Sequence, residues 1–371
     1  MHEATAGVPR RAMNRRAGQL PRLCIVGPMV GRNPGYVTTQ GELLTDYFRA
    51  AGYDVISVSS SPNRYMRLLD ITATLVRCLR RVDIVLVEVY GGLSFLVEDV
   101  ASALARVSGG HTIMHLHGGA MPEFMARFPR WTRRVLGRAD AIVTPSGFLA
   151  TAGGTYDHVL RIIPNVIDLA ACPFRQRNRL RARLFWMRSF HRTYNPLMAL
   201  RVLERVRSVY PDATLVMAGQ DKGLEGMVHK EAARVGLDGA ARFVGFLNPA
   251  AKVREGDAAD IFINTSSVDN LPGAVIEACA MGLPVVSTAV GGVPYLLTDN
   301  ETGLLVPDND SNAMAQAVTR LLGDPALATR LSSNGRRVAE RFCWEQVGRQ
   351  WEELFAQLRA ARSDLREESE T

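Results

Sequence analysis

The chain has 371 residues, of which 47% are hydrophobic and 22% are charged, with a formal net charge of +7. This is the composition of a globular protein with enough apolar residues for a large core, and it excludes a disordered, collagen-like or coiled-coil chain. The five cysteines are widely scattered and include no Cys-x-x-Cys pair, which argues against a disulfide framework and a zinc site and favours a reducing compartment.

Residues 1–21 are polar, rich in arginine and without hydrophobic periodicity, so we expect a disordered basic tail. After them, short apolar runs alternate with helical patterns. The strands expected in this first half are 23–27, 54–59, 83–90, 111–119 (which runs into a turn) and 139–146. Strands that alternate with helices predict a parallel sheet with helices on both faces.

The same alternation restarts after Pro173, where the expected strands are 183–189, 213–219, 241–246, 260–266 and 283–289. The two halves predict an α/β protein of two Rossmann-like domains that face each other across a cleft. The expected domain bounds are 22–172 and 173–345, with a C-terminal helix and charged tail at 346–371; the amphipathic pattern of that helix runs from 344 to 360. Open parallel sheets bind ligands at the carboxyl ends of their strands, so the functional residues are expected in the loops there.

Two carboxylates, Asp269 and Glu277, stand eight residues apart in the second half. Between them the Asn-Leu-Pro-Gly turn at 270–273 opens a helix, which puts Asp269 just before the helix and Glu277 about one turn inside it. The free N–H groups of a helix start favour a phosphate or a polar hydroxyl, so this combination suits a sugar nucleotide. The alternative is that Asp269 caps the helix and Glu277 is a solvated helix residue.

The segment 266–297 resembles the signature of glycosyltransferase family 4, a family of retaining enzymes with the GT-B fold. In that signature two acidic residues eight apart precede a Gly-x-Pro turn, an apolar strand and a Gly-Gly pair; the matching residues here are Asp269, Glu277, Gly282, Pro284, Gly291 and Gly292. The blocks 161–174, 215–220 and 302–310 are similar to further family segments, in the same order. The resemblance extends over nearly the whole chain after residue 22.

The resemblance implies a donor site in the second domain and an acceptor site in the first. Glu277 would bind the ribose of the donor nucleotide, Asp269 would hold hydroxyls of the transferred sugar, and the backbone N–H groups of Leu271 and Gly273 would contact the sugar or the diphosphate. Further expected donor-binding residues are Asn270, Pro272, Gly219 and Phe246. In two departures from the family pattern, Asp269 replaces a glutamate and is one methylene shorter, and Tyr295 stands where many relatives carry a glutamate.

Relatives carry an arginine and, about five residues later, a lysine, which clamp the donor diphosphate. The leaving diphosphate gains negative charge as the glycosidic bond breaks, so fixed cations stabilise the transition state more than the ground state. Arg188 matches the arginine, whereas Thr193 and Tyr194 occupy the lysine position, and Arg192 is the cation that would replace it. Both arginines also belong to the basic segment 174–192, so a general surface role is the alternative.

His117 ends an expected strand beside a glycine turn, where relatives often place a histidine near the transferred sugar. His115 shares its parity along the strand, and a structural role is the alternative for a histidine of this kind. A glycine-rich loop that includes Gly31 and Gly35 follows the first strand, and it would let the backbone approach the diphosphate or the acceptor. No Gly-x-Gly-x-x-Gly or Walker pattern is present, which counts against a dinucleotide oxidoreductase and an NTPase.

The segment 127–138 carries five arginines and no acid, together with Phe128 and Trp131. Such a basic amphipathic surface suits an anionic membrane, and a solvated helix face is the alternative. No nucleic-acid-binding module accompanies the charge, so nucleic acid is not an expected partner. The N-terminus has no apolar core of the signal-peptide kind, and no apolar run approaches the ~18 residues of a spanning helix. We expect a cytoplasmic protein, with the inner face of the membrane as a peripheral location.

The expected function is the transfer of a sugar from a nucleoside-diphosphate sugar to an acceptor hydroxyl with retention, in cell-envelope or exopolysaccharide synthesis. The acceptor would be a carbohydrate or a lipid-linked molecule. The family implies no metal, no bound cofactor is expected, and the oligomeric state stays open. Two alternatives remain: a non-catalytic GT-B protein that binds a sugar nucleotide, which Asp269 and the missing lysine favour, and a GT-B nucleotide-sugar epimerase.

Overall fold

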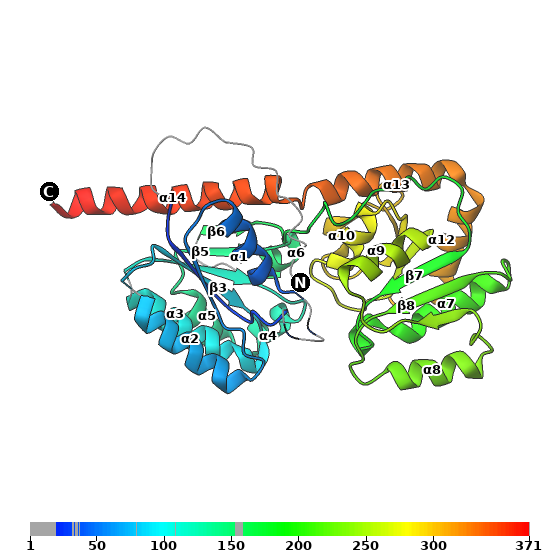
Figure 1. Ribbon diagram of the computed structural model, residues 1–371, viewed down its shortest axis with the longest axis horizontal. Coiled ribbons are helices and arrows are strands. Elements are labelled where there is room, and N and C mark those ends of the chain that lie inside the picture. The colour runs from blue at the N-terminus through cyan, green and yellow to red at the C-terminus, as the bar shows by residue number, and fades with distance from the viewer. Residues whose placement is uncertain are drawn as a thin grey trace, which may run out of the picture. The chain divides into compact units, whose positions relative to one another are not determined.

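The computed structural model describes residues 20–370, apart from residues 32, 34, 35, 37, 79, 108 and 153–158. Its strands form two six-stranded sheets with helices around them (Figure 1). Two compact units are present: one holds the described residues up to His115 with 130–142 and those from Phe355 onward, and the other holds 116–129 and 143–354. The prediction of two parallel α/β sheets is confirmed, whereas the domain bounds 22–172 and 173–345 stay a prediction.

The first sheet has the strand order β2-β1-β3-β4-β5-β6. Its strands are β1 (Leu23–Val26), β2 (Val55–Val58), β3 (Ile84–Val89), β4 (His111–Leu116), β5 (Ala141–Thr144) and β6 (Val159–Ile162). The helices of this part are α1 (Gln40–Ala50), α2 (Arg64–Cys78), η1 (Gly92–Ser94), α3 (Phe95–Val107), α4 (Met121–Arg127), α5 (Pro129–Leu136) and α6 (Gly147–Ala152). Strand β1 pairs in parallel with β2 on one side and β3 on the other, so the strand order reverses between β1 and β3. Ligands of open parallel sheets bind at such a reversal.

The second sheet has the strand order β12-β11-β10-β7-β8-β9, and it reverses at β7. Its strands are β7 (Arg183–Met187), β8 (Thr214–Ala218), β9 (Ala241–Phe243), β10 (Ile261–Asn264), β11 (Val285–Thr288) and β12 (Leu304–Val306). The helices are η2 (Arg192–Tyr194), α7 (Pro196–Arg207), α8 (Glu225–Arg234), α9 (Pro249–Ala258), α10 (Gly273–Ala280), α11 (Val293–Leu296), α12 (Ser311–Gly323) and α13 (Pro325–Glu340). The edge strands β6 and β12, with four and three residues, are additional to the expected ones.

The sheets are covered on both faces, which explains why their strands are apolar without alternation. All six residues of β3 and all four residues of β10 are buried. In the second unit, the buried Trp186 packs on Phe190 with ring centroids 5.3 Å apart and donates its indole N–H to Thr265 Oγ1 at 2.9 Å. These contacts fix the chain directly after β7 and β10, where the predicted site residues begin.

The last helix, α14 (Trp344–Glu370), extends beyond the expected end at residue 360 into the charged segment. Its Phe355 ring lies 5.5 Å from the ring of Phe48 in α1 and 6.1 Å from that of Tyr53. The end of the chain therefore completes the core of the first unit. Among the described residues, no helix combines the length and the apolarity needed to cross a membrane.

Candidate functional site

Arg188 and Asp269 form an ion pair at the carboxyl ends of β7 and β10. Each side chain is 12% exposed, and Arg188 Nε also lies 3.3 Å from Asn264 Oδ1. Parallel pairing puts the ends of β7 and β10 side by side, which brings together two residues that are 81 positions apart in the sequence. The cation and the first carboxylate that the sequence predicted thus meet in one place.

Tyr194 lies against the arginine: its ring centroid is 5.0 Å from the guanidinium carbon of Arg188, a cation–π distance. The position at which the family resemblance expects a lysine is therefore occupied by an aromatic ring that supports Arg188. Arg192 begins η2 and is exposed, and within the described residues its side chain makes no ion pair with Asp269 or Glu277. The assignment of Arg192 as the second cation stays a prediction.

Asp269 contacts a network of buried polar side chains that lie in or directly after β10 and in β11. The Ser266 hydroxyl donates to Asn264 Oδ1 at 2.9 Å and lies 3.4 Å from Asp269 Oδ2, and the Asn264 amide donates to Ser287 Oγ at 2.9 Å. Asn264, Ser266 and Ser287 are all fully buried. Buried polar groups that are mutually hydrogen-bonded hold one geometry, so this network orients the carboxylate rather than leaving it to solvent.

Glu277, the second predicted carboxylate, lies in α10 and pairs with Lys252 of α9, with 2.6 Å between Nζ and Oε1. Both side chains are about a quarter exposed, which leaves the pair open on one side. Lys252 was not among the predicted site residues. The signal in the sequence was its rarity, since it is one of only three lysines beside 41 arginines, and its position 25 residues before Glu277 carried no motif.

The start of α10 lies between the two paired carboxylates, Asp269 and Glu277, in the sequence. Pro272 is its cap residue and has no side-chain cap hydrogen bond, so Asp269 does not cap the helix as the alternative interpretation held. The first hydrogen bonds to Pro272 O come from Val275 and Ile276. The N–H groups of Gly273 and Ala274 therefore precede the helical ladder, and an atom built at the Cβ position of Gly273 meets nothing within 4 Å.

Glycines hold the backbone of the site in close contact. A Cβ atom on Gly292 would lie 1.6 Å from the carbonyl oxygen of Asn270, and Gly292 N–H donates to Asp269 O at 2.9 Å. A Cβ on Gly219 would lie 1.8 Å from the carbonyl oxygen of Arg188. Gly219, predicted to bind donor, thus allows the backbone of Arg188 to approach β8. Gly291 and Gly292 likewise allow the backbone of Asp269 and Asn270 to approach the chain after β11.

The other residues predicted to bind the donor, Asn270, Leu271 and Phe246, differ in how far they are exposed. Asn270 is buried and accepts a hydrogen bond from the Ser146 hydroxyl, which follows β5 within the same unit. Leu271 is partly buried against the core of the second sheet. Phe246 follows β9 and is 46% exposed, and no recorded contact among the described residues joins it to Arg188 or Glu277.

In the first unit, the predicted loop residue Gly31 donates its N–H to the Glu42 carboxylate at 2.9 Å, at the start of α1. Its partner in the prediction, Gly35, lies outside the described residues. Glu42 also forms the capping box of α1 with Thr39. Hydrogen bonds from Gly31 therefore attach the beginning of this loop to the first turn of α1.

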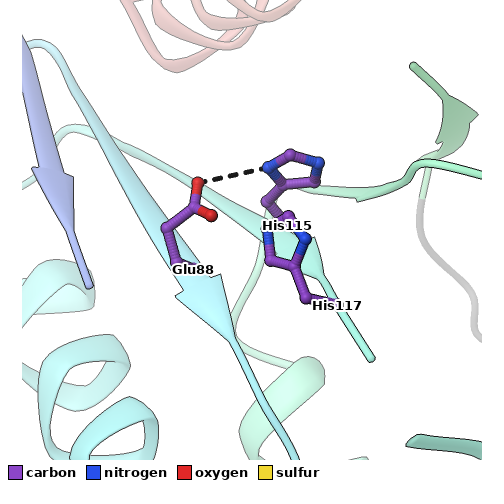
Figure 2. A group of neighbouring side chains, drawn as sticks. All are labelled: Glu88, His115 and His117. Atoms are coloured by element: carbon purple, nitrogen blue, oxygen red, sulfur yellow. Dashed lines mark hydrogen bonds and ion pairs between the residues drawn. The ribbon is translucent and has the colours of Figure 1, made fainter. Parts of the chain in front are cut away.

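The end of β4 carries the predicted His117 and its neighbour His115, both buried. Figure 2 shows Glu88 of β3 pointing toward His115, whose Nδ1 lies 3.2 Å from Glu88 Oε1. His117 follows two residues later along the chain. Imidazole and carboxylate groups are ordinary ligands of divalent metals, but the expectation that no metal takes part stays a prediction.

The basic segment 127–138 is partly neutralised within the first unit. Arg134 and Arg138 both pair with Asp99 of α3, and the Trp131 indole donates to the same carboxylate at 2.7 Å. These contacts lower the pKa of Asp99, although its burial acts in the opposite direction. Two of the five arginines and the tryptophan thus anchor α5 to α3.

Residues 176–338 match the family model described as Glycosyl transferases group 1. The chain is 33% identical over 133 residues to the D-inositol 3-phosphate glycosyltransferase of Streptomyces bingchenggensis, covering 35% of this chain and 29% of that one. It is 34% identical over 108 residues to the lipopolysaccharide core biosynthesis glycosyltransferase LpsE of Rhizobium meliloti, covering 29% and 31%. The chain thus spans under a third of the length of these curated relatives.

Solved structures are similar over most of the chain. Sucrose-phosphate synthase from Thermosynechococcus elongatus has a TM-score of 0.77 at 20% identity, covering 92% of this chain and all of that one. Alr3699/HepE of Anabaena, solved in complex with UDP and glucose, has a TM-score of 0.75 at 18% identity, covering 91% of this chain and all of that one. At these identities the likeness shows the fold, and it confirms the prediction of a two-domain GT-B architecture.

Proposed function

We propose that the protein is a retaining glycosyltransferase of family 4 that moves a sugar from a nucleoside diphosphate to an acceptor hydroxyl. The observation that carries the proposal is that each carboxylate of the motif pairs with its own cation, as Arg188–Asp269 and Lys252–Glu277, and that the start of α10 lies between the two carboxylates in the sequence. The match of 176–338 to group 1 glycosyl transferases supports it, because that segment contains both pairs.

The two ion pairs make the site electrically balanced without a ligand. A nucleotide sugar brings a diphosphate with about two negative charges, so Arg188 can exchange the Asp269 carboxylate for phosphate oxygens, which suit the planar guanidinium equally well. Asp269 is then free to accept hydrogen bonds from sugar hydroxyls. The N–H groups of Gly273 and Ala274 add the partial positive charge of a helix start.

In the proposed reaction, the bond between the anomeric carbon and the diphosphate oxygen breaks while the acceptor oxygen approaches from the same face. The acceptor hydroxyl loses its proton to the departing phosphate oxygen, so no protein nucleophile is required. Arg188 stabilises the charge that develops on the diphosphate, which is its largest contribution because that charge is greatest in the transition state. Retention of the anomeric configuration follows from attack on the face of departure.

We assign the acceptor to the first unit and the setting to cell-envelope or exopolysaccharide synthesis at the inner face of the membrane. The name of the Rhizobium relative, which refers to lipopolysaccharide core biosynthesis, supports this setting. The exposed arginines Arg127, Arg130 and Arg133 support contact with an anionic surface, each contributing about 1 kcal/mol.

The test is calorimetric binding of a panel of nucleotide sugars to the wild-type protein and to Glu277→Ala, followed by detection of released nucleoside diphosphate with and without acceptors. Binding of one donor that Glu277→Ala abolishes, and nucleotide release that depends on an acceptor, would support the transferase. Binding without any release identifies the non-catalytic alternative. Turnover of the donor to an isomeric sugar without acceptor identifies the epimerase.

A further inference from the structure

The first unit contains a cavity of about 140 Å³ at the reversal of its strand order, between the ends of β1 and β3 and the helices α2 and α3. Its wall is apolar apart from a few groups that include Arg67, Glu88, Tyr90, Ser94 and Glu98. A cavity of about 150 Å³ takes up a benzene molecule, so this one has room for the skeleton of a single six-membered ring, with its substituents at the mouth of the cavity. Apolar walls with a few convergent polar groups are typical of small-molecule sites.

Glu98 gives the cavity an unused polar group. The side chain is only 4% exposed; its Oε1 accepts a hydrogen bond from the Tyr90 N–H at 3.1 Å, whereas its Oε2 finds no partner among the described residues. A buried polar atom without a partner costs free energy unless a ligand or water satisfies it. The Glu98 carboxyl therefore presents a hydrogen-bonding atom to the cavity that no described residue uses.

The charged groups around Glu98 argue against a charged ligand. Arg67 of α2 is engaged by the loop after β2, since its Nε and Nη2 donate to the carbonyls of Ser61 and Pro62 at 3.0 and 3.2 Å. Glu88 of β3 is paired with His115 at 3.2 Å. An anion would meet the acidic side chain of Glu88 and a guanidinium that already donates to two backbone carbonyls, so phosphate and carboxylate ligands are disfavoured.

Burial raises the pKa of Glu98 to about 8, against the opposing effects of its backbone hydrogen bonds and of Arg67. At neutral pH the carboxyl is mostly protonated and carries an O–H donor. A protonated carboxyl offers no charge to an amine, which disfavours cations as well. A ligand hydroxyl can both donate to and accept from the protonated carboxyl of Glu98. A neutral ring that carries hydroxyls is therefore the ligand that fits this carboxyl and the apolar wall beside it.

We propose that this cavity binds a neutral, hydroxyl-bearing six-membered ring, a cyclitol or a pyranose, through Glu98, and that it is a subsite for the acceptor. The assignment to the acceptor rests on the proposed function. The binding of the ring itself rests on the cavity, its apolar wall and the unpartnered oxygen of Glu98.

The experiment is saturation-transfer NMR with myo-inositol and methyl α-D-glucopyranoside as neutral probes at pH 7 and pH 9, and with glucosamine and glucose 1-phosphate as charged probes at pH 7. We expect the neutral rings to bind and their affinity to fall about tenfold between these pH values, because the protonated fraction of a group with a pKa of about 8 falls tenfold. Glu98→Gln, which stays neutral, should bind them equally at both values. Preference for a charged probe, or no neutral ring bound at tens of millimolar, would overturn the proposal.

Two leucine substitutions on α3 test the location. Ala101 is fully buried and lines the cavity, so Ala101→Leu should fill it and abolish ring binding, while Ala103→Leu adds the same volume at an exposed position and should not. Ring binding that survives in Ala101→Leu would contradict the assignment. A thermal melt shows whether Ala101→Leu folds. If it does not fold, the Glu98→Gln variant still tests the location, because ring binding should then no longer depend on pH.

Binding of UDP-sugars is measured in the same samples, so that the two proposals fail separately. Nucleotide-sugar binding without ring binding would reject the cavity proposal and leave the proposed function intact. Ring binding without binding of any nucleotide sugar would reject the proposed function, and with it the assignment of the cavity to the acceptor.

Discussion

Lys252 Nζ lies 2.6 Å from Glu277 Oε1 and links α9 to α10 across 25 residues of sequence. The other predicted carboxylate, Asp269, has a cationic partner as well, in Arg188. Each acidic residue of the motif is thus held by one basic residue before any donor is bound. Because a carboxylate that is already oriented loses less entropy on binding, both pairs preorganise the site.

Replacement of Lys252 by methionine, which keeps the unbranched stem of the side chain but removes the amine, should raise the KM for the donor roughly tenfold and leave kcat within about twofold. In the proposed function Glu277 binds the donor ribose equally in the ground and transition states, and this variant removes the group that orients Glu277. Steady-state kinetics with a saturating acceptor measure both constants.

The matched control is Lys252→Arg, which retains the charge and should recover most of the donor affinity. Unchanged KM in Lys252→Met would mean that the pair is an incidental surface contact, as many partly exposed ion pairs are.

Arg188→Gln should lower kcat by on the order of 10² to 10³, as for the loss of one transition-state donor. The leaving diphosphate loses its cation, and Asp269 loses its partner. The control is Arg179→Gln, an exposed position in the same basic segment, for which kcat should not change. A similar loss in both variants would show that the segment acts only through its overall charge.

Gly292→Ala should destabilise the protein by roughly 1–3 kcal/mol or more, because its Cβ would lie 1.6 Å from the carbonyl oxygen of Asn270 and a backbone atom cannot yield cheaply. Gly226→Ala, in α8, meets nothing within 4 Å and should be neutral or slightly stabilising. Urea denaturation midpoints compare the two. Equal midpoints would show that the loop after Asp269 relaxes freely.

The stability of the wild-type protein should fall as pH rises from 4.5 to about 8, because of Glu98. Its pKa is raised from 4.5 to about 8 in the folded state, so between these values the folded protein binds the proton that the unfolded chain releases. The loss is at most about 1.4 kcal/mol per pH unit.

Glu98→Gln removes this dependence, so the free energy of unfolding of the variant should gain on the wild type steadily across that range. Glu204→Gln, which removes an exposed carboxyl on α7, is the control and should run parallel to the wild type. A pH profile of Glu98→Gln parallel to that of the wild type would contradict the assignment of the titration to Glu98.

The strand–helix alternation could be read from the sequence because strands covered on both faces are continuous apolar runs, as 83–90 and 260–266 are. The edge strands β6 and β12 were missed although other strands of the same length were expected; β6 is interrupted by Arg161, and β12 is a run of only three apolar residues between polar turns. The extension of α14 to Glu370 was also missed, because charged residues without an apolar stripe resemble a solvated tail.

For the site, the spacing of Asp269 and Glu277 and the position of Arg188 after a strand were the basis for predicting these residues, and the structure brings Arg188 and Asp269 together. Their roles in the chemistry stay a prediction. Local geometry decides such features: a helix start, a strand end and a turn are each set by a few neighbouring residues. The pairing of each carboxylate with its own cation was decided by the tertiary structure alone. Lys252 reaches Glu277 only because the fold of the second unit brings these residues together, and Glu98 of the first unit lines a cavity only because α2 and α3 lie over the ends of β1 and β3.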